Sequence, residues 1–125
     1  MSEYKDSFVN MISGIGIDIV DVKRFIVYSD KSDIRLSKLF TAKELDYCFR
    51  RDPPSNGLAG KFAAKEAVIK MLASCGTNVG NVKEIEILND RYGKPFVNSS
   101  LEGTSKIRIS ISHDGGFAVA VALMD

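Results

Sequence analysis

The chain has 125 residues, of which 45% are hydrophobic, and its 17 basic and 16 acidic side chains give a formal net charge of +1. This length fits one domain with one core. The balanced charge argues against a nucleic-acid partner held by bulk positive charge. No apolar run reaches the ~18 residues of a membrane span, and residues 1–10 lack the layout of a signal peptide. We therefore expect a cytoplasmic protein with no membrane or nucleic-acid partner.

The cysteines and the histidine give little sign of a metal centre. Cys48 and Cys75 do not form a CxxC pair, and His113 is the only histidine. A zinc site of the Cys/His kind is therefore not expected. Reduced thiols suit the expected cytoplasmic location, with a stabilising disulfide as the alternative.

Residues 11–20 have the alternating pattern of a β-strand. Ile15, Ile17 and Ile19 alternate with glycine or aspartate, which is typical of a strand with one buried face. We expect the isoleucines to form that buried face. Asp18 then points to the opposite side of the strand.

Short helices are expected after this strand. Asp21 can cap the first of them, and residues 31–40 favour a second helix with Ile34 facing inward. Thr41 and Glu44 have the spacing of a capping box, in which each side chain satisfies a free amide at the start of a helix. This third helix is expected to run to about residue 49.

The second half of the chain predicts one helix followed by strands. Residues 58–73 predict the longest helix because they are rich in strong helix formers, and Gly76 supplies an end signal. Residues 84–88, 106–112 and 117–123 predict strands from their alternating or apolar patterns. Helices followed by antiparallel strands indicate an α+β class. The expected organisation is an N-terminal extension, residues 1–11, and a single domain, residues 12–125.

Two carboxylates are candidates for metal ligands. Asp18 lies in an apolar strand, where a bare carboxylate is costly to bury, and Glu66 lies beside the apolar stripe of the longest predicted helix. Carboxylates from two elements, together with phosphate oxygens and water, make an ordinary magnesium site. Lys70 is then free to hold a phosphate. The alternatives stay open: Asp18 as a strand-end cap, and Glu66 with Lys70 as an exposed ion pair.

His113 and the segment Gly93-Lys94-Pro95 are candidates for phosphate contacts. His113 follows a predicted strand and opens a turn with two glycines, where an imidazole can contact a phosphate or transfer a proton. Gly93-Lys94-Pro95 combines a tight turn with a cation. A structural histidine and a plain hairpin loop are the alternatives.

Five segments, in order, carry the most specific information: GIGIDIVDVKRF (14–25), FTAKEL (40–45), LAGKFAAKEA (58–67), GKP within 89–96, and ISISH (109–113). They resemble the motifs of the holo-[acyl-carrier-protein] synthases, a family of 4′-phosphopantetheinyl transferases. The resemblance covers residues 12–123, nearly the whole chain. The N-terminal extension departs from the family, and so does Lys61, which stands where an arginine is common and cannot bind a phosphate bidentately.

The resemblance implies a fold in which a long helix packs on an antiparallel sheet. It also implies a homotrimer with active sites at the subunit interfaces. Asp18 and Glu66 would hold Mg²⁺, and Arg50 or Arg51 would reach the 3′-phosphate of the co-substrate, coenzyme A. The other implied coenzyme A contacts are Lys61, Lys65, Lys70, Gly93, Lys94, Pro95 and His113.

The implied reaction transfers 4′-phosphopantetheine from coenzyme A to a serine of apo-acyl carrier protein, in support of fatty acid biosynthesis. Adenosine 3′,5′-bisphosphate leaves. The resemblance gives Glu66, Lys70 and His113 the catalytic roles. Either Glu66 or a metal-bound water would take the serine proton.

The docking surface for the carrier protein is expected on the first short helix. Carrier proteins are acidic, and Lys23 and Arg24 lie beside the apolar Phe25. Charge would speed the encounter and apolar contact would sustain it. A solvated helix face is the alternative for these residues.

Two other classes of function are compatible with parts of the sequence. A non-catalytic module that binds coenzyme A or a nucleotide would keep the basic residues but would not need both Asp18 and Glu66. A structural oligomer would use the alternating strands for subunit contacts and would bind no magnesium-dependent ligand.

Overall fold

The computed structural model describes residues 13–125, so the predicted extension, residues 1–11, lies outside the described residues. None of the helices in this part of the chain combines the length and apolarity needed to span a membrane. The strands are β1 (Gly14–Asp21), β2 (Glu86–Asn89), β3 (Pro95–Asn98), β4 (Ile107–Asp114) and β5 (Phe117–Met124). The α-helices are α2 (Ile34–Ser37), α3 (Ala42–Cys48) and α4 (Ser55–Ser74), and the 3-10 turns are η1 (Val22–Phe25), η2 (Val82–Glu84) and η3 (Thr104–Lys106).

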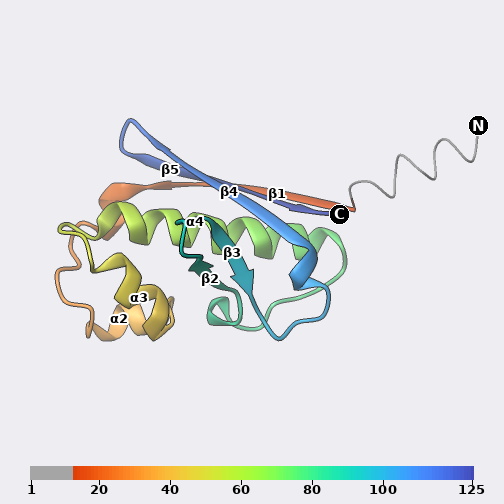
Figure 1. Cartoon of the computed structure of the whole chain (residues 1–125), viewed down its shortest axis with the longest axis horizontal. Helices are drawn as coiled ribbons and strands as arrows, with labels where there is room; N and C mark the ends of the chain where they lie inside the picture. The colour runs from red at the N-terminus through yellow and green to blue at the C-terminus, as the bar shows by residue number, and fades with distance from the viewer. Residues whose placement is uncertain (1–12) are drawn as a thin grey trace, which may run out of the picture.

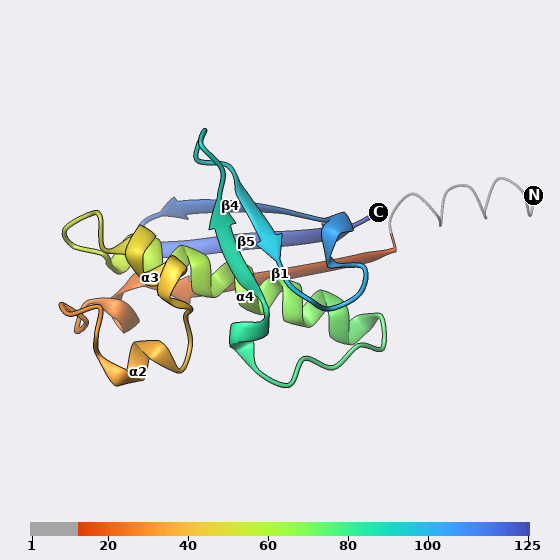
Figure 2. The ribbon, with the colours of Figure 1, turned by 60° about the horizontal axis from the view of Figure 1, so that its bottom comes forward.

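An antiparallel sheet of three strands, in the order β1-β5-β4, forms one layer of the molecule. Helix α4 lies along one face of this sheet (Figure 1) and packs on β1 and β5. The β2–β3 hairpin crosses α4 on the other side (Figure 2), and α3 contacts both α4 and β2. Elements therefore surround α4, which explains why most of its residues are buried. The predicted α+β class and antiparallel sheet are confirmed.

The predicted strand at the start of the chain is confirmed, but its buried face was predicted wrongly. Ile15, Ile17 and Ile19 are 62%, 61% and 61% exposed, whereas Gly14 and Gly16 are buried. The reason is the distance between β1 and α4. A Cβ atom at Gly16 would overlap the backbone carbonyl of the facing helix, so only a glycine fits there and the isoleucines take the other face.

The first predicted helices are shorter than expected. Asp21 caps its element as predicted, by accepting a hydrogen bond from the amide of Lys23, but that element is the single 3-10 turn η1. The second helix, α2, begins only at Ile34, because Asp33 caps it. The prediction that Ile34 faces inward is wrong, since this side chain is 72% exposed and Leu36 takes the buried position.

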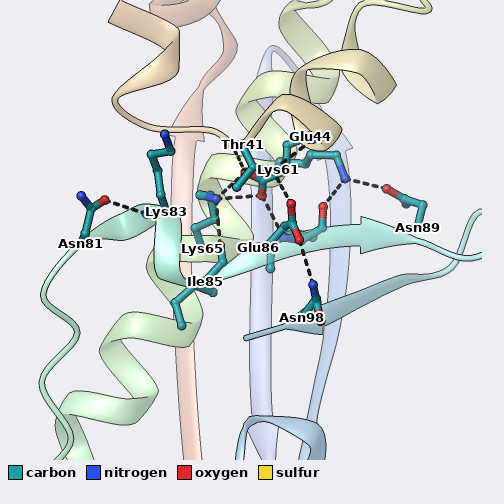
Figure 3. Close-up of polar contacts among 11 residues, drawn as sticks. Thr41, Glu44, Lys61, Lys65, Asn81, Lys83, Ile85, Glu86, Asn89 and Asn98 are labelled. Atoms are coloured by element: carbon teal, nitrogen blue, oxygen red, sulfur yellow. Dashed lines mark hydrogen bonds and ion pairs between the residues drawn. The ribbon is translucent and has the colours of Figure 1, made fainter. Parts of the chain in front are cut away.

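The capping box at the start of α3 is confirmed, and it extends into a buried ion pair. Glu44 accepts a hydrogen bond from the Thr41 amide at 2.8 Å. Its carboxylate also receives two hydrogen bonds from Lys65 Nζ, at 2.6 and 2.7 Å, and one from the Ile87 amide at 2.8 Å (Figure 3). Lys65 donates its remaining bond to the carbonyl of Ile85. One fully buried pair therefore joins α3, α4 and the start of β2.

Removal of one partner from this pair should strongly destabilise the fold. Lys65→Ala leaves the Glu44 carboxylate buried without its counter-charge, and we expect a loss of about 3–5 kcal/mol in the free energy of unfolding. Lys31→Ala is the matched control, because the Lys31–Asp46 pair is 60% exposed on both sides and such pairs contribute at most about 1 kcal/mol. Urea unfolding measures both values, and equal losses would contradict the role given to Lys65.

Candidate active site

A cavity of about 770 Å³ opens beside the first turns of α4 and the edge strand β4. Four cationic side chains line it and no carboxylate does, within the part of the chain that the structure describes. Such a lining favours an anionic ligand. The lining residues that the sequence predicted for coenzyme A are Lys61, Gly93, Lys94, Pro95 and His113, together with both alternatives for the 3′-phosphate contact, Arg50 and Arg51.

His113 is fixed at the wall of this cavity by a backbone contact. It lies near the end of β4, and its Nε2 is 2.8 Å from the carbonyl oxygen of Asn56 on α4. A carbonyl only accepts, so Nε2 carries the hydrogen and Nδ1 is the nitrogen that can accept a proton. The ring lies against Gly60, where an added Cβ would come within 2.9 Å of it. The glycine therefore makes room for the imidazole.

The turn with the sequence Gly93-Lys94-Pro95 is shaped by hydrogen bonds to its neighbour Asp90. The Asp90 carboxylate accepts hydrogen bonds from the amides of Tyr92 and Lys94, at 2.8 and 2.9 Å. Gly93 has a φ of +86°, which a side chain would strain. The cation of Lys94 is thus carried on a defined turn that borders the cavity.

The structure brings the predicted metal ligands near Lys70. Lys70 Nζ lies 2.8 Å from Asp18 Oδ1 and 3.2 Å from the carbonyl oxygen of Ile17, so its ion-pair partner is Asp18 and not Glu66. The hydrogen bond that Lys70 donates to Asp18 raises the pKa of the Lys70 ammonium, and the charge of Glu66 adds a smaller effect in the same direction. Two carboxylates therefore act on one ammonium at the β1 side of α4.

Asp18 and Glu66 fit a magnesium ion only if other ligands complete its coordination. Residues 13–125 contain no cluster of three or more His, Cys, Asp or Glu side chains that could hold a metal. Mg²⁺ is commonly held by one or two carboxylates together with substrate phosphates and water. The position beside Asp18 is taken by the Lys70 ammonium, but this side chain is 56% exposed and can turn into solvent. Asp18 and Glu66 therefore suit a shared site completed by a phosphate ligand.

Asp18 and the cavity lie at opposite edges of the sheet. Asp18 is on edge strand β1, its cross-strand partner is Ala120 on β5, and the next residue in this row is Ile111 on edge strand β4. Neighbouring strands are about 4.8 Å apart, so two intervals separate the edges by roughly 10 Å. Asp18, Glu66 and Lys70 are not among the residues that line the cavity. Within residues 13–125 of a single chain, Asp18, Glu66 and Lys70 therefore do not share a pocket with the cavity residues.

The structure changes the interpretation of two predicted coenzyme A contacts, Lys65 and Lys61. Lys65 has no exposed surface, and its ammonium is held by Glu44 inside the core, which argues against our prediction that it contacts coenzyme A. Lys61 does reach the cavity wall, but it is 4% exposed and donates to the protein itself. Burial lowers the pKa of its ammonium.

The predicted docking surface is only partly exposed. Lys23 and Arg24 are exposed on η1, but Phe25 is 2% exposed and packs against Phe40 and Phe62. The structure therefore removes Phe25 from this surface. The exposed apolar side chains beside the two cations are Ile26 and Val27, each 63% exposed.

Several cavity residues were missed by the sequence analysis. Tyr47, Asn56 and Asn89 border the cavity, and each comes from a different segment of the chain. No local pattern marks them, because only the folded chain brings α3, the start of α4 and the end of β2 together. The sole signals were that Asn89 lies within the segment 89–96 and that Tyr47 and Asn56 are close in sequence to other recognised motifs.

Comparison with known proteins identifies the family. A family model described as the 4′-phosphopantetheinyl transferase superfamily matches residues 14–122. The holo-[acyl-carrier-protein] synthase of Chlorobium luteolum is 42% identical over 113 residues, which cover 86% of this chain and 95% of that protein. That of Halothermothrix orenii is 41% identical over 121 residues, which cover 88% and 94%. The chain belongs to the 4′-phosphopantetheinyl transferase superfamily, and within it to the holo-[acyl-carrier-protein] synthases that its motifs resemble.

Solved structures agree with this assignment. The holo-[acyl-carrier-protein] synthase of Neisseria meningitidis superposes with a TM-score of 0.75 at 31% identity, covering 92% of this chain and 99% of that one. The complex of the Chronobacterium ammoniagenes synthase with coenzyme A gives a TM-score of 0.72 at 27% identity, covering 89% and 95%. The Bacillus anthracis synthase in complex with coenzyme A (3′,5′-ADP) gives 0.71 at 34% identity, covering 90% and 96%.

Cys48 borders the cavity but should be unreactive there. Burial raises the pKa of its thiol to about 12, and the thiolate is the form that reacts. At about pH 8 we expect iodoacetamide to modify the exposed Cys75 and to leave Cys48 intact until the protein is unfolded. Mass spectrometry of digested protein, labelled with and without denaturant, measures this. Rapid labelling of Cys48 in the folded protein would show that the cavity wall is open at that residue.

Proposed function

We propose that Asp18 and Glu66 of one subunit and the cationic cavity of a neighbouring subunit together form the active site of this enzyme. The enzyme transfers 4′-phosphopantetheine from coenzyme A to a serine of apo-acyl carrier protein, giving holo-acyl carrier protein and adenosine 3′,5′-bisphosphate. The observation that carries the proposal is the separation of Asp18 and the cavity on opposite edges of one sheet. A second subunit is the simplest source of the missing half.

A homotrimer would bring such halves together, and the outer face of the sheet supports an assembly. Ile15, Ile17 and Ile19 stand exposed in a row on β1. Their cross-strand partners on β5 are also apolar, with Val121 opposite Ile17 and Val119 opposite Ile19. A contiguous apolar surface of this kind usually marks an interface. The proposed interface therefore buries the isoleucine row that the single chain leaves exposed.

Magnesium is the metal that we propose for Asp18 and Glu66. When bound there, the ion supplies positive charge beside the pyrophosphate of coenzyme A and so favours the charge that develops on the leaving group. Asp18 would then exchange its contact with Lys70 for the ion. Lys70, which is exposed and cationic, would turn to a phosphate oxygen. Glu66 is also one of the two candidates for accepting the serine proton.

The cavity would bind and orient coenzyme A. Arg50 and Lys94 offer cations for its phosphate groups, and the Gly93-Lys94-Pro95 turn offers a wall of fixed shape. His113 presents Nδ1, which can accept a hydrogen bond or a proton. Orientation matters here because in-line attack on a diphosphate depends mainly on position and on electrostatic stabilisation.

The carrier protein would dock on η1 of the subunit that supplies the carboxylates. Lys23 and Arg24 supply positive charge for an acidic partner, and Ile26 and Val27 supply the apolar contact that Phe25 cannot. The Arg24 guanidinium lies 5.1 Å from the ring centre of Phe62, one helical turn before Glu66, so the docking surface and the carboxylates are close. A cytoplasmic location and a role in fatty acid biosynthesis stay predictions.

Loss of one carboxylate should abolish turnover and leave the fold intact. We expect Asp18→Asn and Glu66→Gln each to lower kcat by at least about 100-fold, because each keeps its shape but loses the charge that a metal ligand needs. The free energy of unfolding should change by no more than about 1 kcal/mol. Calorimetric titration of Mg²⁺ in the presence of coenzyme A provides a readout independent of turnover. A variant with normal magnesium affinity and normal kcat would remove that carboxylate from the site.

Two inactive variants should restore activity when they are mixed. Asp18→Asn keeps the cavity, and Lys94→Glu keeps the carboxylates but reverses a charge in the cavity. If subunits are exchanged at random by unfolding and refolding an equal mixture, about one quarter of the sites will combine two intact halves. Assay of the refolded mixture at low coenzyme A should therefore give about one quarter of the parent rate, and each variant refolded alone stays inactive. No recovery in the mixture would place both halves of the site on one chain.

A further inference from the structure

The Gly93-Lys94-Pro95 turn is tied to helix α4 through two side chains that no step of the reaction uses. Lys61 Nζ on α4 donates to the side-chain oxygen of Asn89 at 2.6 Å, as Figure 3 shows, and to the backbone carbonyl of Ile87 at 2.6 Å. Asn89 Nδ2 in turn donates to the carbonyl oxygen of Gly93 at 3.0 Å. A continuous chain of hydrogen bonds thus runs from the helix to the turn.

The order of donors and acceptors in this chain is fixed by Lys61. An ammonium can only donate, so Asn89 must present its oxygen to Lys61 and its amide nitrogen to Gly93. The ammonium itself has little freedom to move. It is almost fully buried, two of its three hydrogens have acceptors, and the ring centre of Tyr47 lies 4.6 Å away. The helix therefore dictates which group of Asn89 faces the turn.

The position of the turn matters because it forms part of the cavity wall. Asn89 is the last residue of β2 and pairs with Pro95, so the turn between β2 and β3 begins directly after this pair. Lys61, Asn89 and Gly93 all border the cavity. Among the described residues, the hydrogen bonds of the turn beyond the last strand pair are those of Asp90 within it and the one from Asn89 Nδ2 to the Gly93 carbonyl, which continues through Lys61 to α4.

We propose that Lys61 and Asn89 are positioning residues, which hold the Gly93-Lys94-Pro95 turn at the distance from α4 that coenzyme A requires. Lys61 acts through Asn89 and does not bind a phosphate itself. The inference rests on the proposed function, because it takes the cavity as the coenzyme A site. It assigns to the Lys61–Asn89 and Asn89–Gly93 hydrogen bonds a role in substrate affinity and not in the chemical step.

Asn89→Asp is the direct test, because it keeps the acceptor for Lys61 and replaces the donor to Gly93 with a second acceptor. Two oxygens would then face each other and push the turn away from α4. We expect the Kd for coenzyme A, measured by calorimetry on the full chain, to rise about 10-fold, the effect of one lost hydrogen bond. The kcat at saturating substrates should stay within about two-fold of the parent value.

Lys61 provides an independent variant pair in case Asn89→Asp does not fold. Lys61→Met fills the same space but leaves Asn89 free to rotate, and it should raise the Kd for coenzyme A by a similar factor. Lys61→Arg keeps a cation that donates to Asn89, and it should retain most of the affinity. Equal coenzyme A affinity in Lys61→Met and the parent would overturn the inference.

Two controls separate the possible failures. Asn98→Asp makes the same chemical change on the neighbouring strand, where Asn98 donates to Glu86 at 2.9 Å and does not touch the turn, so it should leave coenzyme A affinity unchanged. A loss equal to that of Asn89→Asp would show general weakening of the hairpin and overturn the inference. Lys94→Ala tests the cavity itself. If it weakens binding and Asn89→Asp does not, only the positioning role fails; if neither weakens binding, the cavity assignment fails with it.

Discussion

Strand β1 and helix α4 meet so closely that no side chain fits between them at Gly16. A Cβ atom there would overlap the carbonyl oxygen of Ala67 and lie 2.9 Å from the amide nitrogen of Met71. Close packing of small residues lets a backbone approach another backbone directly. The consequence is functional as well as structural, because Asp18 is two residues further along the same strand face. The contact that excludes a side chain at Gly16 thus sets the distance between Asp18 and Lys70.

The other side of α4 is held by charge as well as by apolar packing against Phe40, Ile85 and Ile87. Glu44 and Lys65 bury a full ion pair, and every polar buried side-chain atom among the described residues has a hydrogen-bond partner. Such a pair contributes less to net stability than to the choice of one arrangement, since each alternative packing would leave a charge unpaired. Two separate contacts therefore determine the position of α4: close packing against the sheet, and the ion pair that joins it to α3 and the hairpin. The cavity and the carboxylates both depend on that location.

The sequence predicted those features that depend on local pattern. Alternation identified β1 and β4, and the spacing of Thr41 and Glu44 identified a helix start, because these signals lie within a few residues. The buried face of β1 could not be predicted from alternation, which does not say which side another element will cover. Ile15, Ile17 and Ile19 resemble core residues in sequence, but they are exposed because α4, at Ala67, covers the opposite face of β1.

The sequence predicted many of the residues that line the cavity, but it did not predict the roles of residues whose partners lie far away in the chain. Six of the residues expected to contact coenzyme A do border one cavity, although they lie after α3, on α4, on β4 and in the hairpin. Lys65 stands beside Glu66 in one motif, yet one is buried in the core and the other is partly exposed. The difference comes from Glu44, 21 positions earlier, which draws the Lys65 ammonium inward. Similarly, Lys70 pairs with Asp18 across 52 positions and not with its helical neighbour.

The separation of Asp18 and the cavity on opposite sheet edges has a genetic consequence. In the proposed trimer each subunit contributes to two active sites, giving its carboxylates to one and its cavity to the other. A chain that folds and assembles but has lost both halves therefore disables two sites at once. If such chains are made in the same amount as normal ones, only about one quarter of the sites pair two normal subunits. A defect of this kind lowers activity below the half that remains when the defective chain fails to fold and so never assembles.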